Sequence, residues 1–244
     1  MDAHPFSPQE IRSGGRLSDE VEAALVRAIL DGHYPPDSQL PLERELAVAL
    51  GVGRPTLREA LQRLSRDGWL SIQKGRGTFV NDYWKTGNLN ILATMFQAHA
   101  AIPPELVRWV LELRIAVTPV CVQQAVARNP ARFVAILVAH QDLEDTAAAY
   151  AAFDIQWQRD VAALAPNPLF ALLNRSFLDV GTDLFRLYFT SPENRADSRS
   201  FYGTLLQAGM DADAAQAAEV TQAAMTAGLS NWHTQSSGGS DHAR

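Results

Sequence analysis

The stretch LPLERELAVALGVGRPTLREALQRLSRDGWLSIQKGRGTFV, Leu40–Val80, decides the fold. Its first part begins with Pro41, carries apolar residues at helical spacing and stops at Gly51, which predicts a short helix. Residues 54–68 repeat the pattern, with apolar side chains three and four positions apart before a terminating Gly68. Because only about three residues separate the two runs, they predict a helix-turn-helix.

The residues that follow change from helical to strand periodicity. WLSIQ and TFV are short, β-prone runs separated by the glycine-flanked basic turn KGRG, which predicts a β-hairpin wing. Upstream, LSDEVEAALVRAILDG has a candidate N-cap, Ser18, and one apolar face, so it predicts a further amphipathic helix. Three helices and a small hairpin make residues 1–80 a predicted winged helix-turn-helix domain.

Positive charge is concentrated in this region although the protein as a whole is acidic. The chain has a formal net charge of −6 and a pI of about 5.5, yet residues 44–76 hold seven basic side chains against three acidic ones. Most of the seven are arginines, which suit two-pronged contacts with phosphate or guanine. We therefore expect the third helix and the hairpin to face DNA. For Arg63 and Arg66 the favoured interpretation is a solvated helix face.

The remainder of the chain has a different composition. NDYWKTGNLN, residues 81–90, is interpreted as a linker, and residues 91–234 are rich in alanine and poor in glycine, which predicts an all-helical bundle. The polar residues 235–244 are expected to be a disordered tail. The predicted helical runs are 102–129 with a kink at Pro119, 131–145, 146–163, 168–188, 197–208 and 211–231.

The sequence also excludes several classes of protein. The N-terminus has no basic segment followed by an apolar run, and no window approaches the eighteen or so uninterrupted apolar residues of a membrane helix, so we expect a cytoplasmic protein without a membrane partner. The one cysteine, Cys121, has aliphatic neighbours and no nearby histidine, which indicates a buried, inert thiol. No P-loop, GxSxG, HExxH or CxxC motif is present, so we expect no enzymatic activity and no catalytic residues.

The stretch Leu40–Val80 resembles the winged-helix signature of the GntR family of bacterial transcription regulators. The segments DGWLSIQKGRGTFVNDYWKTGNLNIL and YFTSPENR are similar to the FadR branch of that family, the acyl-CoA-responsive regulators of fatty acid metabolism. Gly53 and Pro55 stand where that branch has threonines, and Lys74 replaces a histidine, so we expect the operator to be read somewhat differently. The DNA-binding residues that the resemblance implies are Arg44, Arg54, Thr56, Arg58, Lys74, Gly75 and Arg76.

The resemblance further implies that residues 91–234 bind an effector and form a dimer. Many GntR relatives hold a metal through an aspartate, a histidine four residues later and two further histidines. Here Gln158 follows Asp154, and no histidine lies between His140 and His233, so we expect neither a metal site nor another cofactor. Long-chain acyl-CoA, the effector of the FadR branch, instead needs an apolar tunnel, cations for its phosphates and an aromatic plane for adenine.

Arginine and aromatic side chains of the helical part are candidates to bind that ligand. The resemblance favours Tyr188 and Trp232, and Arg114 and Tyr202 complete the predicted ligand-binding set. For each aromatic residue the alternative is a plain core position, and for each arginine it is a surface ion pair. The further candidates of the same kinds are Trp157, Arg159, Phe189, Arg195 and Arg199.

Together these observations predict a regulator that binds a pseudo-palindromic double-stranded DNA operator as a homodimer. By resemblance, it represses fatty acid degradation genes, activates synthesis genes and leaves the operator when long-chain acyl-CoA binds. Tyr83 and Trp84 of the linker are candidates to transmit that signal, with simple core anchoring as the alternative. The alternative function is a GntR-family regulator that responds to a different small carboxylate or metabolite.

Overall fold

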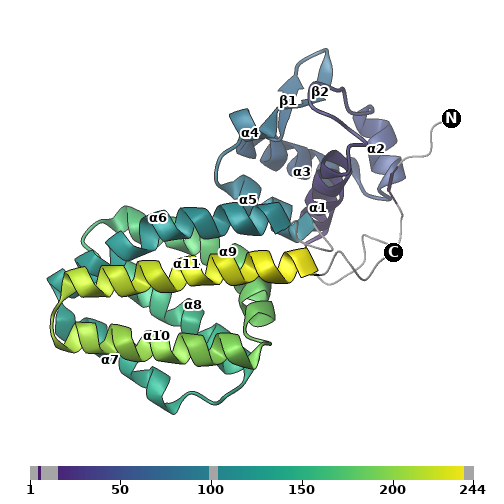
Figure 1. Ribbon diagram of the computed structural model, residues 1–244. Helices are drawn as coiled ribbons and strands as arrows, with labels where there is room; N and C mark the ends of the chain where they lie inside the picture. The colour runs from purple at the N-terminus through teal and green to yellow at the C-terminus, as the bar shows by residue number, and fades with distance from the viewer. Residues whose placement is uncertain (1–4, 7–15, 99–103, 239–244) are drawn as a thin grey trace. The chain divides into compact units, whose positions relative to one another are not determined.

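The computed structural model describes residues 5–6, 16–98 and 104–238, and the chain forms two compact units, Met1–Ala101 and Ile102–Arg244. The described residues are mainly helical, with one two-stranded sheet. The first unit contains the predicted winged helix-turn-helix and the second is all-helical, so the expected fold class is confirmed (Figure 1).

The first unit packs three helices beneath a β-hairpin. Its elements are α1 (Leu17–Leu30), α2 (Glu43–Ala49), α3 (Arg54–Asp67), β1 (Leu70–Gln73) and β2 (Gly77–Val80). The strands are antiparallel, with Leu70 opposite Val80, and Gln39 adds an isolated bridge to Phe79. The apolar positions read from the sequence are the core: Val21, Leu25, Leu46, Leu57, Leu61 and Leu64 are each at most 2% exposed.

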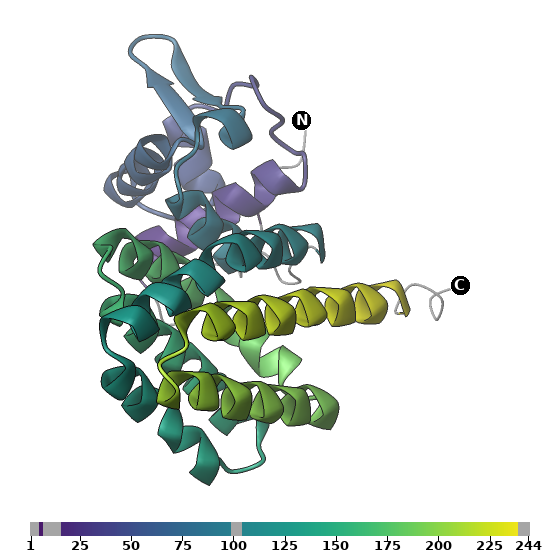
Figure 2. The same ribbon diagram turned by 60° about the vertical axis from the view of Figure 1, so that its left-hand side comes forward.

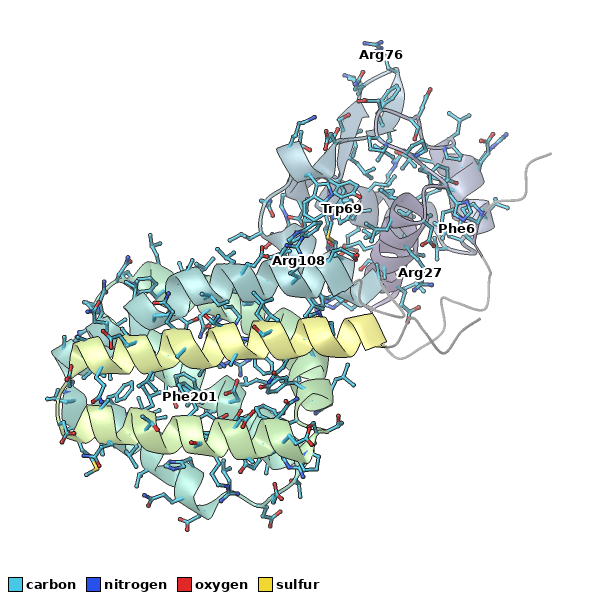
Figure 3. The ribbon with its side chains drawn as sticks, in the orientation of Figure 1. Phe6, Arg27, Trp69, Arg76, Arg108 and Phe201 are labelled. Carbon is cyan, nitrogen blue, oxygen red and sulfur yellow. The ribbon has the colours of Figure 1, made fainter. Side chains whose placement is uncertain are left out.

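This unit continues through the segment that we expected to be a linker. Residues 81–90 include the short helix α4 (Tyr83–Thr86), and α5 (Asn90–Ala98) packs along α1. The Tyr83 ring lies 4.6 Å from the ring of Trp69, which is completely buried (labelled in Figure 3). The structure thus differs from the prediction because a large aromatic side chain at the start of the hairpin gives this segment a packing partner.

The second unit is a helical bundle. Its elements are α6 (Pro104–Arg128), α7 (Pro130–Leu137), a 3-10 turn (Val138–Asp142), α8 (Ala147–Leu164), α9 (Pro168–Tyr188), α10 (Pro192–Met210) and α11 (Ala214–Gly238). Helices α6 and α11 run side by side, α10 packs on α11, and α8 packs on α9 (Figures 1 and 2). The largest fully buried side chains at its centre are Phe133, Tyr150, Trp157, Phe189 and Tyr202.

Prolines and capping side chains set where several of these helices begin. Asn129, Asn167 and Ser191 accept hydrogen bonds from backbone N–H groups of the first turn, and a proline follows each of them. Helix α10 therefore starts at Pro192 rather than at the predicted residue 197. At the other end, α11 continues through residues 235–238, which we expected in the tail, and the rest of that predicted tail lies outside the described residues.

Helix α6 contains the two unusual residues noted in the sequence. Pro119 lies inside it, and Cys121 is buried as predicted, with burial raising the pKa of its thiol to about 12. By length and composition, Glu105–Arg128 is the one described helix that would suffice to cross a membrane. Here it packs along α11 and carries a charged residue, Arg114, into the bundle.

Candidate functional site

Helix α3 has an apolar face and a basic face. Its apolar side chains are buried in the first unit, whereas Arg54 and Arg58, one turn apart, are exposed. Arg54 is the first residue of the helix, Pro55 lies in the first turn and Thr56 is half-buried beside them. Unpaired N–H groups and the helix dipole make this end of α3 attractive to an anion such as a phosphate.

The hairpin presents a second basic element. Lys74, Gly75 and Arg76 are all exposed, and Figure 3 shows Arg76 at the hairpin tip. Gly75 and Gly77 have φ of 78° and 117°, in the left-handed region that favours glycine. The side-chain amide of Gln39 donates to the Arg76 carbonyl at 2.9 Å and so holds the turn in place.

Five cations form what we call the basic surface: Arg44, Arg54, Arg58, Lys74 and Arg76, all exposed. Within the described ranges, four of them make no ion pair, and the fifth, Arg58, donates from Nε to Glu43 Oε2 at 2.7 Å. Unpaired exposed arginines and lysines keep their full charge for a polyanion, which is the property that DNA binding requires.

Arg63 behaves differently from the solvated residue that we expected. Its guanidinium donates to Asp19 at 2.7 Å, to Glu22 at 3.1 Å and to Glu59, so its side chain is only 26% exposed. These contacts connect α3 to α1 and balance the positive charge of Arg63. Arg66 is the more solvated of the pair, with its side chain 66% exposed while it binds Asp67.

The second unit contains a cavity of about 520 Å³ between α6, α8, α9, α10 and α11. Most of its wall is apolar, from residues such as Val107, Leu111, Phe177, Leu184, Phe185 and Phe201. Arg114, Tyr188 and Trp232 of the predicted ligand-binding set line it. Phe201 is labelled in Figure 3. An apolar cavity with few polar groups is typical of a small-molecule site.

Tyr202, the fourth predicted ligand-binding residue, is not part of the cavity wall. It is fully buried, and its hydroxyl donates to Asp154 Oδ1 at 2.7 Å, while burial raises its pKa well above 10. Asp154 also accepts from Trp157 Nε1 at 2.9 Å and from Gln158 Nε2 at 2.5 Å. Tyr202 thus holds a carboxylate of the wall in place, and a direct contact of Tyr202 with a ligand stays a prediction.

Arg114 is the one basic side chain among the lining residues. Burial lowers its pKa, and the nearby Asp154 carboxylate opposes that effect. Its Nη2 donates to Gln158 Oε1 at 2.7 Å, and its guanidinium lies 5.1 Å from the centre of the Phe185 ring. Its Nε is buried without a hydrogen-bond partner. A buried N–H of a cation without an acceptor is costly, so this atom is suited to a ligand oxygen.

The described residues contain no group of three or more histidine, cysteine, aspartate or glutamate side chains placed to hold a metal. Asp154 and Gln158, at the positions that carry metal ligands in other GntR relatives, are hydrogen-bonded to each other instead. Asp154 already accepts three hydrogen bonds, which a cation would have to displace. The residues present do not fit a metal, and sensing without one stays our prediction.

Two further arginine candidates have structural partners. Arg195 binds Asp145 at 2.6 Å and the carbonyls at the end of α9, and Arg199 donates to Tyr150 Oη at 2.6 Å. Neither these arginines nor Arg159 line the cavity, whereas Trp157 and Phe189 do. Sequence reasoning missed the small residues of α11 that line the cavity, because only the fold shows which side of that helix faces inward. These residues are Ala223, Ala224, Ala227 and Gly228.

Comparison with protein families gives two matches that together span most of the chain. Residues 17–80 match the family described as bacterial regulatory proteins, gntR family, and residues 81–238 match the FadR C-terminal domain. Both matches agree with the resemblance seen in the sequence.

Curated relatives also match over most of the chain. The fatty acid metabolism regulator proteins of Shewanella pealeana and Shewanella halifaxensis are 44% and 43% identical to this chain over 191 residues, which are 78% of this chain and 80% of theirs. Among solved structures, that of Lar from Listeria monocytogenes superposes with a TM-score of 0.62 at 15% identity, covering 92% of this chain and 99% of Lar. That likeness concerns the fold alone.

Proposed function

We propose that this chain, which belongs to the GntR family of bacterial regulatory proteins and carries a FadR C-terminal domain, regulates fatty acid metabolism genes in response to long-chain acyl-CoA. It is a transcription regulator of the FadR type and not an enzyme. Acyl-CoA binding in the helical unit releases the operator, which relieves repression of degradation genes and ends activation of synthesis genes.

The basic surface is the DNA-binding element of this proposal. Arg54 and Arg58 enter the major groove with the start of α3, where Thr56 contacts a phosphate or a thymine methyl group, and Arg44 contacts the backbone. Lys74, Gly75 and Arg76 follow the hairpin tip into the adjacent minor groove. A single recognition helix offers few base contacts, so a homodimer reads two half-sites of a pseudo-palindromic operator in the cytoplasm, without a membrane partner.

The observation that carries the effector assignment is an apolar cavity of about 520 Å³ whose wall includes an unsatisfied buried donor, Arg114 Nε. The apolar wall suits a fatty acyl chain, and the donor suits the carbonyl oxygen at the head of that chain. Asp154 and Asp197 also line the cavity, and their charge disfavours phosphate groups inside it. The acyl chain and thioester therefore occupy the cavity and the phosphate groups lie outside it, while Tyr188 and Trp232, which line the cavity, are candidate contacts of the bound ligand.

Thermal-shift and calorimetric titrations with oleoyl-CoA, oleate and small carboxylates test this assignment. We expect oleoyl-CoA to bind most tightly and to raise the melting temperature, and to dissociate a preformed protein–operator complex. Binding of a small carboxylate with no response to oleoyl-CoA would support the alternative, a GntR-family regulator with a different metabolite effector. The cavity is larger and more apolar than a small carboxylate requires, which favours the acyl ligand.

A further inference from the structure

Glu43 and Arg58 form an ion pair that joins the two helices of the helix-turn-helix. Arg58 Nε donates to Glu43 Oε2 at 2.7 Å. Glu43 is the first residue of α2, and Arg58 is the fifth residue of α3, one turn after Arg54. The side chain of Arg58 is 63% exposed and that of Glu43 is 37% exposed, so the pair lies at the surface.

An exposed pair of this kind contributes little to stability, about 0–1 kcal/mol. It also places a negative charge among the cations of the basic surface, directly before Arg44. On electrostatic grounds alone, this carboxylate weakens binding to any polyanion. A role in stability or in general DNA affinity therefore does not account for Glu43.

The geometry of the contact suggests a different role. Only Nε of Arg58 is held by Glu43, and within the described residues no contact engages its two terminal NH2 groups. When Nε holds the carboxylate, the two terminal NH2 groups of the guanidinium stay available on its other edge. This pair of donors matches the acceptors O6 and N7 of guanine. A long arginine side chain that is free in solution loses rotamer entropy when it binds, and one that is already held loses less.

We propose that Glu43 is a positioning residue that orients Arg58 for guanine and so sets operator discrimination, at some cost in general DNA affinity. This inference rests on the proposed function, because it takes Arg58 as a base contact. If Glu43 has this role, removing its side chain changes general DNA affinity and operator discrimination in opposite directions. Loss of the Glu43 charge strengthens binding to all DNA, whereas loss of its hydrogen bond to Arg58 weakens the preference for the operator.

The test compares variants of the full-length chain by fluorescence anisotropy on two duplexes. One is an operator selected by the protein itself from random-sequence DNA, and the other has the same composition in scrambled order. The ratio of the two dissociation constants is the discrimination. Arg58→Ala should lower it by about 5- to 150-fold, the value of one two-pronged base contact.

Glu43→Ala should bind scrambled DNA more tightly than the parent protein and still discriminate less. Glu43→Gln keeps an oxygen acceptor for Arg58 Nε but no charge, so it should bind scrambled DNA more tightly with discrimination close to that of the parent. Glu45→Gln is the matched control. Glu45 is exposed on the same helix, and among the described residues its carboxylate accepts a hydrogen bond only from the Leu42 N–H, at 3.4 Å, so its loss of charge should leave discrimination unchanged.

A double-mutant cycle decides whether Glu43 acts through Arg58. In the Arg58→Ala background, Glu43→Ala should lower discrimination no further, which gives a coupling of at least about twofold between the two sites. Equal discrimination in Glu43→Ala and Glu45→Gln, or additive losses in the cycle, would overturn the inference while leaving the DNA-binding proposal intact. Unchanged discrimination in Arg58→Ala would remove the base contact itself, and the positioning role with it.

Discussion

The proposed function predicts that substituting Gly228 by leucine shortens the longest acyl chain that the cavity accepts. Gly228 lies in α11 and lines the cavity, and a Cβ added there would meet no atom within 4 Å. The Cβ of the new side chain therefore enters open space. If it displaces about three methylene groups of a bound chain, at about 0.8 kcal/mol each, the loss is about 2.4 kcal/mol, or roughly 50-fold in affinity for oleoyl-CoA.

The same substitution should stabilise the free protein. Glycine inside a helix costs about 0.5–1 kcal/mol relative to a good helix former, so Gly228→Leu should raise the melting temperature while weakening the ligand. Isothermal titration with a series of acyl-CoAs from decanoyl to oleoyl should show the loss for long chains only. Gly228→Ala is the control, because it gains helix stability without filling the cavity. Undiminished oleoyl-CoA affinity in a folded Gly228→Leu protein would refute an acyl chain beside α11.

Four further predictions concern other parts of the chain. Arg54→Ala should weaken operator binding by about 1–3 kcal/mol, and Lys74→Ala should reduce the slope of log affinity against log salt by about one, both measured by anisotropy. Tyr202→Phe should lower the free energy of unfolding in urea by about 1–3 kcal/mol, because buried Asp154 loses a donor. Desolvation acts to raise the pKa of Asp67, but hydrogen bonds from Arg66 and Asn90 outweigh it and lower the pKa below 3.8. Asp67 therefore contributes stability above about pH 4 that is lost on acidification, and Asp67→Asn should flatten that part of a pH titration of unfolding.

The DNA-binding half of the fold could be predicted because local signals determine it. Helix spacing in residues 54–68, the glycine at its end and the basic turn of the hairpin each act within a few residues, and the structure places them as expected. The role of Arg63 could not be predicted in this way. Its partners Asp19 and Glu22 lie more than forty positions away, on a helix whose orientation depends on the whole core.

The ligand site was less accessible to sequence reasoning because five helices build it. Aromatic and basic residues could be named as candidates, yet the sequence does not show that Tyr188 lines the cavity while Tyr202 is buried against Asp154. Composition and helical runs predicted the helices, and the resemblance favoured Tyr188 and Trp232, but packing determines which side chains line the cavity. Rotating a helix about its axis by the angle between two successive residues changes which side chains face inward. Amino-acid composition does not determine this angle.

The segment predicted as a linker bears on how a ligand signal reaches α3. Trp69 Nε1 donates to Thr94 Oγ1 at 2.9 Å, and Thr86 Oγ1 donates to the carbonyl of Gly68, the residue that ends α3 in a left-handed conformation. A Cβ at Gly68 would collide with the backbone of Thr86, so this approach requires glycine. Because α4 and α5 are bonded to the residues at the end of α3, we expect a displacement of α5 to move α3 with it. A ligand that favours one position of α5 by about 1–3 kcal/mol would then change operator affinity by the same free energy, about 5- to 150-fold.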